Sequence, residues 1–394
     1  MFTSLINIYF FAVFSLPLGI FTQYDYNTCL NECGMASEIL PKEREQQPLY
    51  KIYGGSPINI NTFPFVALLY AQKSDCSFSV SCTAVILSNR YVITAEHCLE
   101  YPISKMSECG IEDEYIDEDL DQTFNPNEIS IFPGVSSISE AKESGDAFKV
   151  KTIKRFSSNI EYGNRQFIDI AILELNEELT FSETIRPVCV AKSFSEQMGQ
   201  RGFFVGFGRT SDSHQRPPSS GDRMLNSNQL NEVTLSFASS KFCENLHPRN
   251  KKDYICAGSK FRGLSSGDSG GPILINQNGR YFAVGLASFT DGVIGENLTE
   301  TALQKDVAPD IFSRLSVFCQ WIQNKTNVEC KEIEAEIPSA CRDRAETIYQ
   351  SYIGVDRNVD SNKDIQYHSN IETTKKNEKG WFERTKESLY SIFG

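Results

Sequence analysis

The stretch at residues 65–94, FVALLYAQKSDCSFSVSCTAVILSNRYVIT, holds three short apolar runs separated by polar, turn-forming residues. The runs are Phe65 to Tyr70, Cys82 to Leu87 and Tyr91 to Thr94, and they are rich in Val, Ile, Phe and Tyr. Runs of about four to eight such residues between turns are typical of β-strands. The stretch therefore predicts three consecutive strands.

The same pattern continues along the chain. Further strands are expected at Lys149 to Ile153, Ile168 to Leu175, Val233 to Phe237, Pro272 to Ile275 and Tyr281 to Ala287. Many short strands with few helical periods predict an all-β fold, an antiparallel sandwich or barrel. Val317 to Lys325 is expected to form a short closing helix.

The overall composition excludes one class of function. The chain has 394 residues, of which 40% are hydrophobic and 23% are charged, and these are values of a globular protein. Its formal net charge is −13. Recognition of phosphates needs clustered Lys and Arg, so we expect no nucleic-acid partner.

The N-terminus is interpreted as a secretory signal peptide over residues 1–22, because it is apolar from Leu5 onward and then turns polar. A secreted, extracellular protein without membrane association is expected. An uncleaved membrane anchor is the alternative, since no Lys or Arg precedes the apolar run.

The 12 cysteines favour disulfides formed after export over scattered buried thiols. The sequons at Asn297 and Asn324 would then accept glycans.

Three segments do not fit the strand pattern. Residues 23–51 are expected to be an exposed linker. The acidic stretch at residues 108–121, ECGIEDEYIDEDLD, is expected to be a solvated loop; it lacks the EF-hand glycine and final glutamate, so we expect no bound metal. The tail from Lys331 is polar, which is typical of disorder. From Trp381 onward two alternatives remain: an amphipathic helix that docks on a partner or a membrane surface, or a frayed chain end.

One histidine stands out from the four in the chain. Hydrolysis through a serine needs a base, a group that orients the base, and donors for the oxyanion. His214, His247 and His368 lie in polar segments, whereas His97 follows an apolar strand and directly precedes Cys98, which could fix it through a disulfide. A purely structural histidine is the alternative.

The hexapeptide GDSGGP at residues 267–272 is a second candidate. Its glycines permit a tight turn, which can direct the N–H groups of Gly267 and Ser269 at one point, as an oxyanion hole requires. The alternative is an ordinary Gly/Ser-rich hairpin loop.

The third candidate is Asp169, which lies inside the apolar run FIDIAIL at residues 167–173. Burial of a carboxylate is unfavourable without a partner, and the Nδ1 proton of a histidine is a suitable one. The alternative is an aspartate at a strand edge that faces water.

These stretches together resemble a known family. The segments TAEHC at 94–98, DIAIL at 169–173 and GDSGGP at 267–272 are similar, in this order, to the three catalytic signatures of trypsin/chymotrypsin-like serine endopeptidases. The resemblance implies a fold of two antiparallel six-stranded β-barrels. As a function it implies the hydrolysis of protein or peptide substrates without a cofactor. It also implies these roles: Ser269 the nucleophile, His97 the general base and then acid, Asp169 the orienting carboxylate, and Gly267 and Ser269 the oxyanion donors.

The same resemblance implies a precursor. KIYGG at 51–55 is similar to the family's activation site, so an activating protease would cut between Lys51 and Ile52, and the new ammonium of Ile52 would pair with Asp268. The implied segments are a signal peptide at 1–22, a propeptide at 23–51, a peptidase domain at 52–326 and a largely disordered extension at 327–394.

The resemblance further implies two disulfides, Cys82 with Cys98 and Cys243 with Cys256. It also suggests a link from Cys189 to the propeptide through Cys29 or Cys33. It assigns no partner to the other cysteines, which are Cys76, Cys109, Cys319, Cys330 and Cys341.

The substrate pocket combines several residues. By resemblance, Gly263 lies at its base and supplies no charge, while Asp310 stands on the opposite wall, where its carboxylate would favour basic side chains. Thr290, two residues after Ser288, would narrow the entrance and favour smaller side chains. The alternative for Asp310 is a surface turn after a proline.

Two departures from the family pattern bear on activity. Glu96 replaces a small residue beside His97, where a carboxylate would raise the imidazole pKa or disturb its packing. Ser265 replaces a cysteine, so one disulfide beside the pocket is expected to be absent and the pocket looser. The rival hypothesis is an inactive homologue that acts as a binding scaffold.

Overall fold

The computed structural model describes residues 29–38, 55–73, 78–101, 122–156, 168–211, 224–225, 228–246, 252–258, 263–289 and 309–347. Several predicted features lie outside them: the signal peptide, the acidic stretch, Lys51, Ile52, Thr290, the sequon at Asn297, three of the four histidines and the chain beyond residue 347. Within the described residues, no helix combines the length and the apolar character needed to span a membrane.

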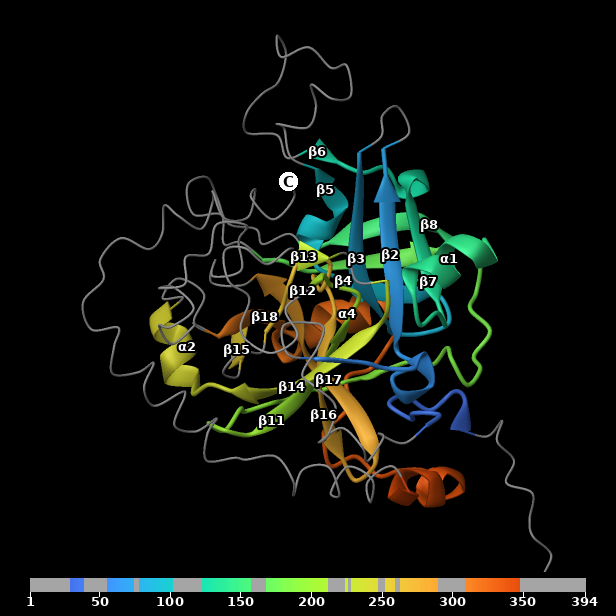
Figure 1. Cartoon of the computed structure of the whole chain (residues 1–394). Coiled ribbons are helices and arrows are strands. Elements are labelled where there is room, and N and C mark those ends of the chain that lie inside the picture. Colours follow the sequence, from blue (N-terminus) through green and yellow to red (C-terminus); the bar gives the residue numbers. More distant parts are fainter. Residues whose placement is uncertain are drawn as a thin grey trace, which may run out of the picture.

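The first half of the chain forms a closed antiparallel barrel. In spatial order its strands are β2 (Val66–Gln72), β3 (Ser79–Ile86), β4 (Tyr91–Thr94), β9 (Ala171–Leu175), β8 (Phe148–Arg155) and β7 (Ile129–Pro133). Every second residue of a strand points inward, and the buried aliphatic side chains that result fill the barrel. The blue-to-green strands of this barrel occupy the upper part of Figure 1.

The second half closes in the same way. Its six strands are β14 (Asn231–Phe237), β11 (Arg201–Gly206), β16 (Pro272–Gln277), β17 (Arg280–Phe289), β18 (Asp310–Arg314) and β15 (Tyr254–Gly258), and pairing of β14 with β15 completes the ring. β1 (Ser56–Pro57) adds to β14, and β10 (Cys189–Val190) pairs in parallel with β17. The predicted fold of two six-stranded barrels is confirmed.

Few helices accompany the barrels. Those with complete bounds in the described residues are α1 (Ile138–Ser144), α2 (Ser240–Leu246) and α4 (Cys319–Thr326), the last of which continues from a 3-10 turn at Leu315–Phe318, and residues 342–347 are also helical. The predicted closing helix is therefore present. Two small two-stranded ribbons are also present, β5 (Glu100–Tyr101) with β6 (Gln122–Thr123) and β12 (Thr210–Ser211) with β13 (Met224–Leu225).

The two barrels share one apolar core. The largest buried cluster contains Phe63 and Phe65, which directly precede β2 of the first barrel, and Phe203 and Tyr281 of the second barrel. The rings of Phe63 and Tyr281 meet edge to face, with centroids 5.3 Å apart. Burial of large aromatic surfaces on both sides fixes how the barrels meet.

The two ends of the described chain meet on the second barrel, in what we call the terminal joint, residues 29–38 with residues 328–347. Disulfides join Cys29 to Cys341 and Cys33 to Cys189, and a third joins Cys319 to Cys330. The expected link between Cys189 and the N-terminal segment is thus made through Cys33. The sequence had provided no partner for Cys341, because that partner lies 312 positions away.

The terminal joint is built into the fold rather than resting on its surface. Met35 and Ala36 are completely buried. Gly34 donates its N–H to the carbonyl of Pro187 (2.9 Å), and its own carbonyl accepts from the N–H of Tyr281 (2.8 Å). The buried guanidinium of Arg280 pairs with Glu32 (3.1 Å).

The C-terminal half of the joint closes over a hairpin turn. Asn278 and Gly279, with φ of 52° and 82°, form the two-residue turn between β16 and β17. The Ala345 carbonyl lies so close to Gly279 that a Cβ there would collide with it. Arg344 donates to the carbonyls of Ala36 and Ser37 and so ties the two halves together.

This contact predicts the effect of a single methyl group. Gly279→Ala should lower the free energy of unfolding by about 3 kcal/mol, from left-handed strain of about 1–2 kcal/mol and from overpacking against Ala345. Gly145→Ala is the control, because Gly145 has φ of 67° and a Cβ there would meet nothing within 4 Å. Chemical denaturation of both variants measures the difference, and equal losses would show that residues 341–347 do not pack on this turn.

Candidate active site

His97 and Asp169 are brought together by the register of two strands. β4 pairs with β9 so that Thr94 lies opposite Ala171, and continuing this register past the strand ends places Asp169 beside the turn that carries His97. His97 lies in a 3-10 turn, Glu96–Leu99, which the disulfide between Cys82 and Cys98 fastens to β3. Both residues are almost completely buried.

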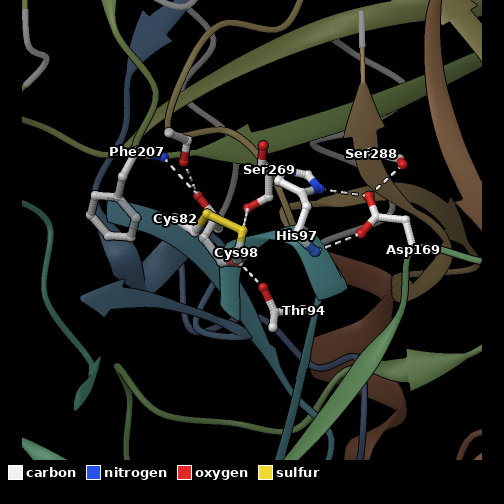
Figure 2. Close-up of a disulfide and its surroundings, with 10 residues drawn as sticks. Cys82, Thr94, His97, Cys98, Asp169, Phe207, Ser269 and Ser288 are labelled. Carbon is white, nitrogen blue, oxygen red and sulfur yellow. Dashed lines mark hydrogen bonds and ion pairs between the residues drawn. A yellow bond between two sulfur atoms is a disulfide. The ribbon is translucent and has the colours of Figure 1, made fainter. Parts of the chain in front are cut away.

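The Asp169 carboxylate receives three hydrogen bonds. Its Oδ1 accepts from the main-chain N–H of His97 (3.0 Å), and its Oδ2 lies 2.8 Å from His97 Nδ1. The hydroxyl of Ser288, which β17 contributes from the second barrel, donates to the same Oδ2 (2.5 Å). In Figure 2 these contacts are dashed, and the His97 ring is drawn between Ser269 and Asp169.

The electrostatics favour an ionised carboxylate and a basic imidazole. Burial works against the charge on Asp169, but His97 and the hydroxyl of Ser288 outweigh it and hold the pKa of Asp169 below its ordinary value. Burial also disfavours protonated His97, yet the Asp169 carboxylate and, to a lesser extent, Glu100 raise the pKa of His97. Because the ionised carboxylate only accepts, Nδ1 carries the proton, and Nε2 of the neutral ring is left as a proton acceptor.

The GDSGGP stretch forms the loop that leads into β16. Gly267 and Gly270 have φ of 96° and 78°. Gly270 also packs so closely on the first barrel that a Cβ would collide with the hydroxyl of Thr94 and the carbonyl of Thr83. Only glycine fits there. The half-buried Ser269 is thereby held at the junction of the two barrels.

Two carbonyls of this loop are fixed by backbone donors. The carbonyl of Ser266 accepts from the N–H of Arg209 (2.8 Å), and that of Asp268 accepts from the N–H of Gly271 (2.9 Å). In a trans peptide the N–H points away from the C=O. The N–H groups of Gly267 and Ser269, which belong to these same two peptides, therefore point away from Arg209 and Gly271 respectively.

Asp268 points into the second barrel. It is fully buried and accepts from the N–H of Gly208 (2.8 Å) and the N–H of Ser265 (2.9 Å). Burial raises its pKa to about 7, although these hydrogen bonds act in the opposite direction. Among the described residues, no cation pairs with this carboxylate.

Both departures in the sequence have a structural explanation. The carboxylate of Glu96 pairs with Arg155 (3.2 Å), and the carboxylates that raise the pKa of His97 are those of Asp169 and Glu100. The main causes of the raised His97 pKa therefore do not include Glu96. Ser265, in place of a cysteine, donates its hydroxyl to the carbonyl of Arg209 (2.6 Å) and so links two loops without a disulfide.

Two of the predicted pocket residues, Gly263 and Asp310, lie close together. Asp310 is buried with 3% exposure at the start of β18, so the alternative of a surface turn is excluded. Its Oδ2 accepts from the N–H of Leu264 (2.8 Å) and would lie 2.8 Å from a Cβ placed on Gly263. Ser288, predicted as a pocket residue, directs its hydroxyl toward Asp169 instead. The remaining predicted disulfide, Cys243 with Cys256, is present.

Sequence reasoning missed several contacts around the site. Ser313 donates its hydroxyl to the main-chain carbonyl of Asp169 (3.0 Å), and Thr83 contacts the GDSGGP loop. Thr83 follows Cys82 directly, so its position beside a predicted disulfide was an available signal. Nothing in the local sequence pointed to Ser313. The described residues contain no group of three or more His, Cys, Asp or Glu arranged to hold a metal ion.

Removal of the Asp169 charge should reverse the shift at His97. In Asp169→Asn only burial remains as a strong influence, so the pKa of His97 should fall below the ordinary value of about 6.5. In the parent, protonation of His97 stabilises the fold below about pH 6.5 and this contribution is lost as the pH rises through the raised folded pKa. NMR titration of the four histidines measures the change. Glu100→Gln, as a control, should lower the pKa less; a raised His97 pKa in Asp169→Asn would contradict the assignment.

Comparison with known proteins agrees with this geometry. The family model described as Trypsin matches residues 52–322. The chain is 22% identical to CLIP domain-containing serine protease B4 of Anopheles gambiae over 70% of each chain. It is 25% identical to the proclotting enzyme of Tachypleus tridentatus, over 69% of this chain and 65% of that protein. It is also 25% identical to phenoloxidase-activating factor 1 of Holotrichia diomphalia, over 73% of each. With two closed barrels and a family match over more than half its length, the chain belongs to the trypsin family of serine proteases.

Proposed function

We propose that the chain is a secreted serine endopeptidase made as an inactive precursor. The observation that carries this proposal is the buried pair of His97 and Asp169, with Nδ1 and Oδ2 2.8 Å apart, at the same junction of the barrels as Ser269. The five disulfides of the described residues support an oxidising compartment.

The proposed reaction passes through an acyl-enzyme. Ser269 Oγ attacks the carbonyl carbon of the substrate while His97 Nε2 takes the serine proton, and Asp169 holds the imidazolium that forms. The N–H groups of Gly267 and Ser269 stabilise the oxyanion. His97 then gives its proton to the leaving amine, and water repeats the sequence to release the acid.

Activation is proposed to require cleavage between Lys51 and Ile52. Asp268 supports this step, because a buried carboxylate whose pKa is raised to about 7 provides a favourable site for a new ammonium group. The terminal joint implies that residues 29–51 stay attached after the cut through Cys29 and Cys33. The names of two relatives, a proclotting enzyme and a phenoloxidase-activating factor, favour a protein substrate within an activation cascade.

One experiment tests activation and chemistry together. Limited cleavage of the purified precursor should yield protein that hydrolyses peptides and whose new N-terminus is Ile52. Ser269→Ala, cut in the same way, should lose activity by a factor on the order of 10⁶ while it folds normally. A peptidase with another N-terminus would refute the activation site. An inactive cleaved parent that a fluorophosphonate fails to label would favour the scaffold hypothesis.

The proposed specificity includes basic side chains at the residue before the scissile bond. The Asp310 carboxylate is buried against Gly263, and its Oδ2 lies where only a residue without a side chain allows it, 2.8 Å from the position of a Cβ at residue 263. A Lys or Arg of the substrate that reaches this carboxylate would form a charge-assisted hydrogen bond in a partly dry site.

Substitution of Asp310 should change this preference selectively. Asp310→Asn keeps the size of the side chain and removes its charge, so kcat/KM for Lys and Arg substrates should fall about 10- to 100-fold, while substrates with small neutral residues are cleaved as before. Profiling of the activated parent, Asp310→Asn and Asp310→Gly on a peptide library measures the ratio. Undiminished cleavage after Lys and Arg in both variants would show that Asp310 does not set specificity.

A further inference from the structure

Thr83 lies in β3 of the first barrel, directly after the disulfide-bonded Cys82, and is completely buried. Its side chain reaches across to the second barrel. The hydroxyl donates to the carbonyl of Gly267 (3.0 Å) and accepts from the main-chain N–H of Phe207 (3.1 Å). Figure 2 shows the dashed contact at the Phe207 nitrogen beside the disulfide.

We propose that Thr83 is a positioning residue, whose hydroxyl fixes the peptide between Gly267 and Asp268 and thereby aligns the two N–H groups that stabilise the oxyanion. This inference rests on the proposed function. Thr83 does not touch the substrate in this proposal, and it acts only through the GDSGGP loop.

The direction of both hydrogen bonds follows from the chemistry of the groups. A main-chain N–H can only donate, so Thr83 Oγ1 must accept from Phe207, and its single proton is then free for the Gly267 carbonyl. The two contacts form one continuous chain of donors and acceptors. A valine of the same shape can make neither bond and would leave both backbone groups unpaired.

Thr83 makes one of the two hydrogen bonds that hold this peptide, and the one that comes from the other barrel. The peptides on either side are held by backbone partners, Arg209 for the carbonyl of Ser266 and Gly271 for the carbonyl of Asp268. The peptide between them is held at both ends: its N–H, that of Asp268, donates to the carbonyl of Ser265 (3.0 Å), and its carbonyl, that of Gly267, accepts from the hydroxyl of Thr83. Rotation of this peptide changes the backbone on both sides of it, and Gly267, at φ of 96°, has the conformational freedom of glycine.

The backbone of Thr83 restrains the same loop. Its N–H donates to the carbonyl of Ser269 (2.9 Å), and its carbonyl accepts from the hydroxyl of Thr94 (2.9 Å). Thr83 therefore contacts the loop at the nucleophile through its main chain and at the oxyanion peptide through its side chain. A change confined to the hydroxyl leaves the first contact in place and tests the second.

Thr326 provides a matched control far from this loop, at the end of α4. Its buried hydroxyl also accepts from a main-chain N–H, that of Val328 (3.0 Å), and donates to a main-chain carbonyl, that of Ile322 (2.6 Å). Thr326→Val thus removes the same kind of bridge. Because Thr326 completes the sequon at Asn324, all proteins in the comparison carry Asn324→Gln.

The test compares four activated proteins: the parent, Thr83→Val, Thr83→Ser and Thr326→Val. For each, the melting temperature, kcat, KM and the affinity for a peptidyl aldehyde are measured. The aldehyde is informative because its adduct with the serine places an oxygen in the oxyanion hole. Direct loss of one oxyanion donor lowers kcat about 10²- to 10³-fold, so loss of an indirect restraint should lower it about 10- to 100-fold. In Thr83→Val, aldehyde affinity should fall with kcat while KM stays within about twofold. Thr83→Ser should restore kcat, and Thr326→Val should lower the melting temperature alone.

Two outcomes overturn the inference: Thr83→Val that keeps kcat and aldehyde affinity within twofold of the parent, or Thr83→Ser that is as impaired as the valine variant. If Thr83→Val does not fold, Thr83→Ala is judged by the same two criteria. An activated parent that does not hydrolyse peptides at all would instead refute the proposed function, so the two failures are distinguishable.

Discussion

The buried carboxylate of Asp169 is the constraint around which the two barrels are arranged. A charge this deep requires donors on every side, and the first barrel supplies only those of His97. The second barrel completes the set through Ser288, and Ser313 holds the Asp169 main chain. The docking of the barrels and the ionisation of this carboxylate therefore depend on each other.

The GDSGGP loop depends on the same junction. It belongs to the second barrel by sequence, but its Ser269 and Gly267 carbonyls are held by Thr83 of the first barrel. Glycine at 270 lets the loop approach the first barrel closely enough for these contacts. A site assembled across two barrels in this way is sensitive to their relative position, which the shared aromatic core of Phe63, Phe203 and Tyr281 keeps fixed.

The terminal joint gives the proposed propeptide a structural role. Residues 29–38 contact β17 and the segment 328–347, with Met35 and Ala36 completely buried, and two disulfides hold them there. A cut after Lys51 would leave this part of the fold intact. The joint lies on the second barrel, so Cys341 is held at a fixed point on that barrel.

The sequence by itself determined the all-β class and most of the barrel strands, because short apolar runs between turns are local features. Its motifs suggested the residues of the candidate site, and the family resemblance suggested two disulfides. The sequence did not determine the partner of Cys341, the contacts of Thr83 with the GDSGGP loop, the contact of Ser288 with Asp169 or the ion pair of Glu96 with Arg155. Each of these joins residues that are far apart in the chain or that belong to different barrels. Only the tertiary structure decided them, because strand register and barrel docking bring such residues within hydrogen-bonding distance.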